Sequence, residues 1–435
     1  MKSICFYFQV HQPLKLRTYR FFDIGHHKEY FDEHANGYFM QQLAETCYLP
    51  ANRLLLEMIK KHGKKFKVSF NISGVALEQF EMYTPDVLNS FKDLAQTGNV
   101  EFLAGTYSHG LSSLKSKNEF FVQVRKHEQK LFDLFGVKPT AFANTELILN
   151  DDIANNIYEL GYHTVVSEGA KHILGWKSPN LLYCSSANPK VKLLLRNFQL
   201  SDDIGFRFSE TSWIEWPLTA EKFTGWIKAL GAKAEVINLF LNYETFGEQQ
   251  KATTGIFEFL KALPKAVFNK SDFVFSTPSE VSDKLQPAST LHVPYPISWA
   301  DEERDITPWL GNEMQNEAFN KLYELESLVR NCNEPAILKD WCRLQSCNYF
   351  YYMSTKWFSD GIIKRYHNPF SSPYDAFINY MNILADFEIK VRNACEQKKE
   401  LSKATTTKSK TKTGSKIDAS GEVKKKLSRK EKVSR

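Results

Sequence analysis

The sequence predicts an α/β fold in which parallel strands alternate with helices and close, or nearly close, into a barrel. The strand signal is a series of short runs rich in Phe, Val, Ile and Leu. These runs cover residues 3–10, 66–73, 99–104, 139–146, 163–167, 191–196, 235–243 and 272–276. The stretches between them favour helices, and seven or eight strand–helix units in about 280 residues are typical of a barrel.

The helical segments follow from the spacing of apolar residues. In 41–62 and 118–135 these residues recur three and four positions apart, as one face of a helix requires. A shorter segment, 153–160, leads to Gly161, which is a common helix stop. Each predicted helix therefore separates two predicted strands, and we expect the barrel to occupy residues 1–285.

The pattern changes after Pro278. A connector containing Pro287, Pro294 and Pro296 precedes a polar loop, 298–305, and long helical patterns follow. These patterns cover residues 313–331, 336–354 and 373–396. We therefore predict a helical C-terminal domain over residues 286–396.

The net charge of +6 comes from the end of the chain. Residues 398–435 hold 14 Lys and Arg against 4 Asp and Glu, whereas the rest holds 42 against 46. This segment has no aromatic residue and few apolar ones, so residues 397–435 are predicted to be a disordered basic tail. We favour a solubilising role and expect no specific nucleic acid partner, although contact with nucleic acid or an acidic surface through counterion release is the alternative.

Several classes of protein are disfavoured. The seven cysteines are an odd number with no C-x-x-C pair, which favours reduced thiols over disulfides or a zinc site. No histidine has another three or four residues away, so we predict no metal and no cofactor. A phosphate-binding glycine loop and a Gly-x-Ser-x-Gly elbow are also missing. With no signal peptide and no membrane span evident, we expect a cytoplasmic protein without a membrane partner.

Four predicted strands end in polar residues, which indicates one shared site. The run 239–248 passes from apolar residues into Tyr243 and Glu244, the first strand runs into His11, and another leads to Glu146. A fourth strand precedes the pair Asp202 and Asp203. In a parallel barrel such strand ends meet at the mouth.

Glu146 and one of the two aspartates form a candidate catalytic pair. Two carboxyl groups at one cavity suit a nucleophile and a general acid/base, as glycoside cleavage requires. The alternative for Asp202 is a helix cap before Ile204, because Ser-Asp ahead of an apolar run is a common helix start. From spacing alone these two interpretations are equally weighted.

The motifs, taken in order, resemble those of glycoside hydrolase family 57. They are His11-Gln12-Pro13, 98–103, Asn144-Thr145-Glu146, 195–206, 243–248, 299–305 and 309–315. The resemblance covers residues 1 to about 395. It implies an incomplete (β/α)7 TIM-like barrel, followed by a helical domain. It also implies α-amylase-like cleavage of α-1,4-linked glucans or maltooligosaccharides with retention of anomeric configuration.

The resemblance also assigns roles to residues. Glu146 falls on the nucleophile and Asp202 on the acid/base, with Asp203 as the competitor. A further set is expected to contact the substrate: His11, Glu101, His109, Tyr243, Glu244, Trp299 and Asp301. Two positions depart from the expected pattern, because Asn242 stands where we expect Asp and Gln249 where we expect His.

Two alternatives remain open at the level of sequence, and a third is disfavoured. If a sugar rather than water resolves the covalent intermediate, the protein is a 4-α-glucanotransferase or a branching-type enzyme. A polysaccharide deacetylase would need an Asp with a spaced His pair, which the chain lacks. The departures at Asn242 and Gln249 make a catalytically impaired glucan-binding protein the second open alternative.

Overall fold

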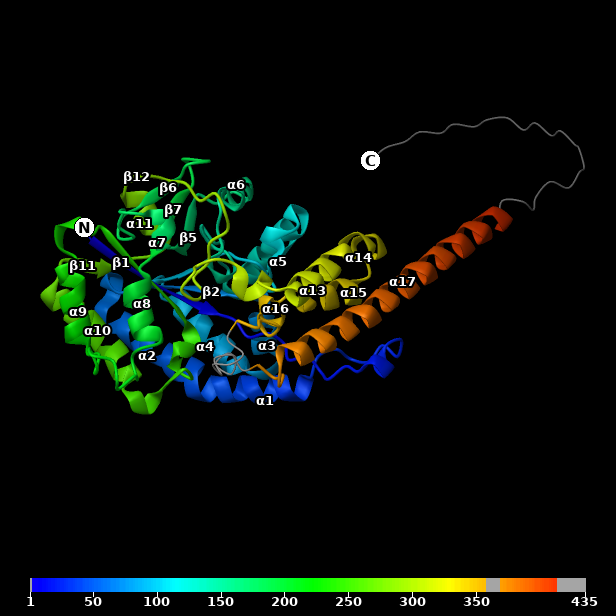
Figure 1. The fold of residues 1–435 in the computed structure, drawn as a ribbon, viewed down its shortest axis with the longest axis horizontal. Helices are drawn as coiled ribbons and strands as arrows, with labels where there is room; N and C mark the ends of the chain where they lie inside the picture. The colour runs from blue at the N-terminus through cyan, green and yellow to red at the C-terminus, as the bar shows by residue number, and fades with distance from the viewer. Residues whose placement is uncertain (1, 357–367, 413–435) are drawn as a thin grey trace, which may run out of the picture.

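The computed structural model describes residues 2–356 and 368–412 and has a barrel of parallel strands with helices packed around it (Figure 1). Within residues 2–356, seven strands form the barrel. They are β1 (Lys2–Val10), β2 (Val68–Ile72), β3 (Val100–Phe102), β4 (Ala141–Ala143), β5 (Thr164–Glu168), β7 (Lys192–Arg196) and β8 (Val236–Asn242). Each lies inside or within a residue of a run that the sequence predicted.

The ring of strands closes through two weak junctions. β1 pairs in parallel with β8 and β2, β2 pairs with β3, and β5 pairs with β4 and β7. A bridge between Ala104 and Phe142 joins β3 to β4, and the pair Arg196–Asn238 joins β7 to β8. The predicted (β/α)7 barrel is confirmed, and these short ladders are where it is least complete.

The eighth predicted strand, β11 (Phe273–Phe275), is not a full member of the barrel. It pairs with the first residues of β1, Lys2–Ile4, on the edge where β2 pairs with Tyr7–Val10. β11 therefore fills the N-terminal end of the barrel wall. The sequence did not predict four further short strands: β6 (Tyr183–Ser185), β9 (Phe246–Gly247), β10 (Gln250–Lys251) and β12 (Ser289–Leu291).

Burial on both faces explains why the strands are continuous apolar runs. Along β1, Cys5 and Tyr7 belong to the interior cluster with Phe240 of β8. Phe6 and Phe8 point the other way, into the cluster shared with the surrounding helices. Alternate side chains of a strand point to opposite faces, so a strand between interior and helices needs apolar residues at every position.

The helices of the barrel region follow the strands in sequence. They are α1 (Glu33–Leu43), α2 (Leu49–His62), α3 (Gly74–Tyr83), α4 (Pro85–Gln96), α5 (Lys117–Phe135), α6 (Asp151–Glu159), α7 (Lys171–Leu174), α8 (Phe198–Gly205), α9 (Ala220–Ala229), α10 (Ile256–Lys270) and α11 (Pro278–Lys284). A π-helical turn, Ala44–Tyr48, joins α1 to α2. The predicted helix 41–62 is thus the end of α1, this turn and α2.

The region after the barrel is helical, as predicted. Its helices are α12 (Thr307–Leu310), α13 (Glu313–Glu324), α14 (Glu326–Cys332), α15 (Pro335–Leu344), α16 (Cys347–Tyr351) and α17 (Pro373–Lys412). One hydrophobic cluster contains Phe142 and Leu193 of the barrel together with Trp341 and Tyr380 of the helices. The two regions therefore share a core.

α17 continues beyond its predicted end near residue 396 and projects away from the barrel (Figure 1). The prediction of disorder from residue 397 is therefore wrong for residues 397–412. Lys is the commonest residue of this stretch and is a good helix former, so it extends a helix whose first turns are anchored by packing. The rest of the predicted tail, 413–435, lies outside the described residues. Among the residues described, no helix has the length and apolarity needed to cross a membrane.

Candidate active site

Glu146 lies directly after β4 at the mouth of the barrel. Each oxygen of its carboxylate accepts a hydrogen bond from a ring: Oε1 is 2.8 Å from Nε2 of His109, and Oε2 is 2.6 Å from the indole nitrogen of Trp299. The backbone of Glu146 is left-handed, with φ of 53° and ψ of 26°. His109 also has a positive φ, 53°. Left-handed backbone is unfavourable for side chains other than glycine and clusters at functional sites.

The rings of the two histidines of the site pack against each other at a tilt. The rings of His11, which follows β1, and His109 have centroids 4.4 Å apart. His11 Nδ1 lies 2.7 Å from Ser73 Oγ, and its Nε2 lies 3.1 Å from Asn348 Oδ1. Burial and the neighbouring His109 lower the pKa of His11 well below its usual value. His11 is therefore a neutral hydrogen-bonding group at neutral pH.

A small cavity of about 60 Å³ joins these residues at the mouth. Its walls come from four strand ends, the loop after residue 298 and the start of α16. The lining residues are Gln9, His11, Gln12, Pro13, His109, Glu146, Asn242, Glu244, Glu248, Gln249, Trp299 and Asn348. Five of the nine predicted site residues thus lie together: His11, His109, Glu146, Glu244 and Trp299.

Glu244 is a second carboxyl group in this cavity. It follows β8, and its Oε1 accepts hydrogen bonds from Tyr48 at 2.5 Å and from Gln12 at 3.1 Å. Burial raises the pKa of Glu244 to about 7, despite these hydrogen bonds. Asn242, where we expected an aspartate, lines the same wall. A neutral side chain at this position avoids adding a charge beside Glu244.

Asp202 does not line the cavity and belongs instead to a buried cluster of charges. Arg196 at the end of β7 donates to Asp202 Oδ1 at 2.5 Å, and Arg304 donates to Asp202 Oδ2 at 2.9 Å. The guanidinium carbon of Arg196 also lies 5.3 Å from the ring centroid of Trp299, whose indole binds Glu146. Asp202 is thereby connected to the nucleophile candidate through one arginine and one tryptophan.

Glu168 is the second acid of this cluster. Its Oε2 lies 3.3 Å from Nη1 of Arg196, and its side chain is fully buried. Within the described residues, Glu168 Oε1 has no hydrogen-bond partner. Burial raises the pKa of Glu168 to about 7, with Arg196 opposing the rise.

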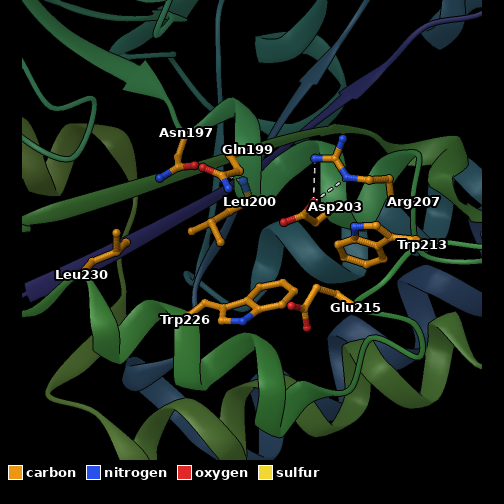
Figure 2. A pocket seen from close by; sticks show the side chains of 9 residues that line it. All are labelled: Asn197, Gln199, Leu200, Asp203, Arg207, Trp213, Glu215, Trp226 and Leu230. Carbon is orange, nitrogen blue, oxygen red and sulfur yellow. Dashed lines mark hydrogen bonds and ion pairs between the residues drawn. The ribbon is translucent and has the colours of Figure 1, made fainter. Parts of the chain in front are cut away.

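Asp203 faces a different pocket (Figure 2). Its Oδ1 accepts from Nε of Arg207 at 2.7 Å, and the rings of Trp213 and Trp226 stand nearly edge to face beside this pair. This second pocket, about 470 Å³, lies between α8, α9 and the segment joining them. Its lining residues are Asn197, Gln199, Leu200, Asp203, Arg207, Trp213, Glu215, Trp226 and Leu230.

The structure corrects two predicted substrate contacts. Tyr243 is fully buried, and its hydroxyl donates to Asn52 at 2.5 Å within the cluster between barrel and helices. Glu101 accepts from the backbone nitrogen of Ser279 at 3.2 Å and from Thr140, which precedes β4. Glu101 therefore lies at the N-terminal end of the barrel, opposite the mouth. Both residues stabilise the fold and do not line the cavity.

Asp301 remains a prediction. Asp301 lies two positions after Trp299 in the chain and does not line the cavity. Its carboxylate lies 2.8 Å from Nζ of Lys356. Burial raises the pKa of Asp301 to about 6.

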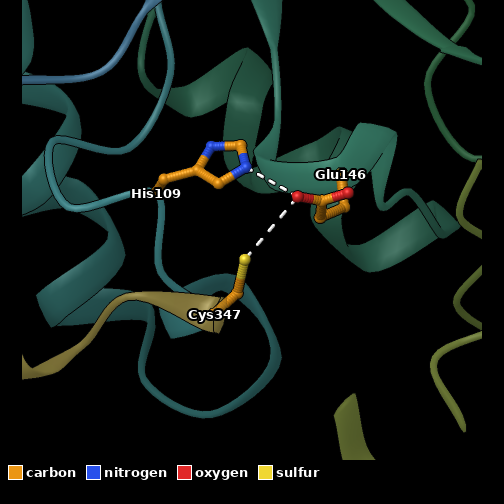
Figure 3. A group of neighbouring side chains, drawn as sticks. All are labelled: His109, Glu146 and Cys347. Carbon is orange, nitrogen blue, oxygen red and sulfur yellow. Dashed lines mark hydrogen bonds and ion pairs between the residues drawn. The ribbon is translucent and has the colours of Figure 1, made fainter. Parts of the chain in front are cut away.

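Sequence reasoning missed several residues of the site. Arg196 ends a predicted strand and Glu168 directly follows one, so a charged residue beside an apolar run was an available signal. Cys347 and Asn348 carried no such signal, because they begin α16 some 200 residues after Glu146 in the chain. Figure 3 shows Cys347 and His109 approaching the same carboxylate oxygen of Glu146.

Comparisons with known proteins agree with this geometry. The model of glycosyl hydrolase family 57 matches residues 5–294. A Methanocaldococcus jannaschii protein named "Putative alpha-amylase" is 41% identical over 405 residues, covering 89% of this chain and 85% of that protein.

Solved structures share the fold at low identity. The 4-alpha-glucanotransferase of Thermococcus litoralis matches with a TM-score of 0.64 and 16% identity, over 80% of this chain and 56% of that one. A family 57 branching enzyme of Thermococcus kodakaraensis matches with a TM-score of 0.62 and 13% identity, over 84% and 88%.

Proposed function

The chain belongs to glycosyl hydrolase family 57, and from that premise we propose that it cleaves α-1,4-glucosidic bonds in α-glucans with retention of configuration. The observation that carries the proposal is the Glu146 carboxylate, which stands in the mouth cavity with both oxygens held by donors. The seven free cysteines fit a reducing compartment such as the cytoplasm.

In the first step, a carboxylate oxygen of Glu146 attacks the anomeric carbon while the bond to the glycosidic oxygen breaks. His109 and Trp299 hold the carboxylate through 2.8 and 2.6 Å hydrogen bonds, which orients it without neutralising it. This arrangement supports Glu146 as the nucleophile, because a fixed carboxylate forms the covalent glucosyl-enzyme at a lower entropic cost.

Asp202 supplies the proton to the leaving oxygen and later removes one from the incoming water. Both of its oxygens accept from guanidinium groups, so one of these bonds opens when substrate binds. Arg304 is the partner we expect to move, because it lies in the loop after Trp299, whereas Arg196 is fully buried. The freed oxygen of Asp202 takes up a proton from solvent and donates it to the glycosidic oxygen as the glycosidic bond breaks.

A glucanotransferase is the second candidate, favoured by the small size of the cavity. Trp299 and Asn348 line it together with the strand ends. A confined site that admits little water gives an acceptor sugar more time to resolve the intermediate.

Incubation with maltoheptaose tests the proposal. We expect the wild type to release shorter maltooligosaccharides, and chromatography of the products would show longer chains as well if transfer dominates. E146Q should lose at least about 10⁴-fold in rate, because the nucleophile is absent. E210Q is the matched control, since Glu210 is exposed and should leave the rate unchanged.

Two outcomes would contradict the proposal. Full activity of E146Q would remove Glu146 as the nucleophile. A wild type that binds glucan but forms neither shorter nor longer products would be a binding protein, as the departures at Asn242 and Gln249 allow.

A further inference from the structure

Three chemically different ligand atoms meet at the nucleophile candidate (Figure 3). Nε2 of His109 lies 2.8 Å from Oε1 of Glu146, and Sγ of Cys347 lies 3.6 Å from the same oxygen. All three atoms fall within 4.8 Å of one another. His109 and Cys347 are buried, whereas Glu146 is partly open to the cavity.

The ligand set selects for zinc over other common divalent ions. Mg²⁺ and Ca²⁺ prefer oxygen ligands, whereas Zn²⁺ takes thiolate sulfur, imidazole nitrogen and carboxylate oxygen together. Zinc–ligand bonds of about 2.0–2.3 Å at tetrahedral angles place the ligand atoms roughly 3.3–3.6 Å apart. The observed 2.8 and 3.6 Å are within about half an ångström of these separations.

We propose that His109, Glu146 and Cys347 bind Zn²⁺ and that the bound ion inhibits the enzyme. The ion replaces the hydrogen bonds that the histidine and the thiol now make to Glu146, and the thiol proton passes to solvent. Three protein ligands leave the fourth position to a water in the cavity. Bound zinc occupies the oxygen of Glu146 that His109 holds, so the carboxylate no longer attacks a sugar.

The surroundings support an ion at this place. The cavity beside Glu146 and His109 measures about 60 Å³, more than the roughly 15 Å³ that one water needs. The ring of His109 is held by packing against His11, and Cys347 is held by the hydrogen bond from its backbone nitrogen to the carbonyl of His109. The site is therefore preorganised from three segments, which is why the spacing of residues along the sequence predicted no metal.

Cobalt substitution tests binding without relying on activity. Adding Co²⁺ to the reduced full-length protein should produce a sulfur-to-cobalt charge-transfer absorption that Zn²⁺ displaces. C347S should lose this absorption, and H109Q should weaken Zn²⁺ affinity by at least about 100-fold, the upper end of the cost of losing a supporting group. C395S is the matched control, because it also removes one thiol but Cys395 of α17 is not part of the cluster and interacts with Cys332 instead. It should retain the full signal.

Inhibition is the second measurement, and it rests on the proposed function. Zn²⁺ should stop glucan cleavage by the wild type and by C395S, EDTA should restore it, and C347S should need at least about 100-fold more Zn²⁺. A cobalt signal that persists in C347S and disappears in C395S would overturn the proposal. Absence of any cobalt signal in the wild type would overturn it too. If the wild type cleaves no glucan while the cobalt signal behaves as expected, the proposed function fails and the metal site stands.

Discussion

Asp202 and Asp203 are neighbours on α8 and lie in opposite environments. Asp202 faces the barrel interior, where Arg196 and Arg304 bind its two oxygens and Glu168 lies on the far side of Arg196. Asp203 faces the pocket between α8 and α9, where it pairs with the half-exposed Arg207. Successive residues of a helix point about 100° apart. A shift of one position along α8 therefore turns a carboxylate from the barrel interior to the outer pocket.

The two ion pairs, Arg196 with Asp202 and Arg207 with Asp203, therefore have different roles. The pair of Arg196 and Asp202 is removed from water and tied to Trp299 and Glu146, so its geometry bears on the chemistry. Arg207 remains 36% exposed, so water screens its pair with Asp203. We therefore expect changes on the inner side to reduce activity and stability, and matched changes on the outer side to have small effects.

The largest expected effect is on catalysis. D202N should lower kcat/KM on maltoheptaose by roughly 10²–10⁴-fold, the usual contribution of a general acid/base, because the amide cannot exchange the proton. D203N should stay within about fivefold of the wild type. Initial rates of the two variants give the comparison directly.

A larger loss of kcat/KM in D203N than in D202N would contradict the assigned roles of the two aspartates. If D203N were the inactive variant and D202N were active, the acid/base would be Asp203, and the arginine cluster would be structural. Circular dichroism of both variants is the control, because an unfolded protein would also be inactive.

The next effect is on stability. R196M should cost about 3–5 kcal/mol in the free energy of unfolding, because it leaves buried Glu168 and Asp202 without their shared counter-charge. R207M removes the outer pair and should cost at most about 1 kcal/mol. Urea unfolding of the two variants measures both values. Equal losses would mean that the inner pair is as well solvated as the outer one.

The smallest expected effect is a change in how the free energy of unfolding depends on pH. It concerns Glu168, which belongs to the inner cluster around Arg196. Burial raises the pKa of Glu168 from its ordinary value of 4.5 to about 7, so the folded protein binds more protons than the unfolded chain between these values. The stability that this group contributes is fully present below pH 4.5 and is lost as the pH rises through 7.

E168Q should therefore reduce the fall in the free energy of unfolding between pH 4.5 and 7. Part of the fall should remain, because the pKa of Glu244 is also raised to about 7. Urea midpoints across this range measure the slope. An unchanged slope in E168Q would mean that Glu168 is ionised throughout, as an exposed glutamate is.

Much of the fold could be predicted because its signals are local. Each barrel strand is a short apolar run, since both of its faces are buried, and each run ends where the chain reaches the polar mouth. Glu146, His11 and Glu244 stand at such ends, so the sequence placed them together correctly. The predictions for Glu101 and Tyr243 were wrong, because a polar or aromatic residue beside a strand need not face the mouth. Glu101 lies at the opposite end of the barrel, and Tyr243 packs between the barrel and the helices.

By itself, the sequence determined the alternation of strands and helices, the helical region that follows and the family to which the chain belongs. Tertiary structure decided which aspartate of α8 faces inward, because the rotation of a short helix depends on what packs against both sides. It also decided that Cys347 reaches Glu146 and that Asn348 reaches His11, because the C-terminal helices share a core with the barrel. Contacts between segments 200 residues apart depend on packing across the molecule, and no local pattern of residues encodes them.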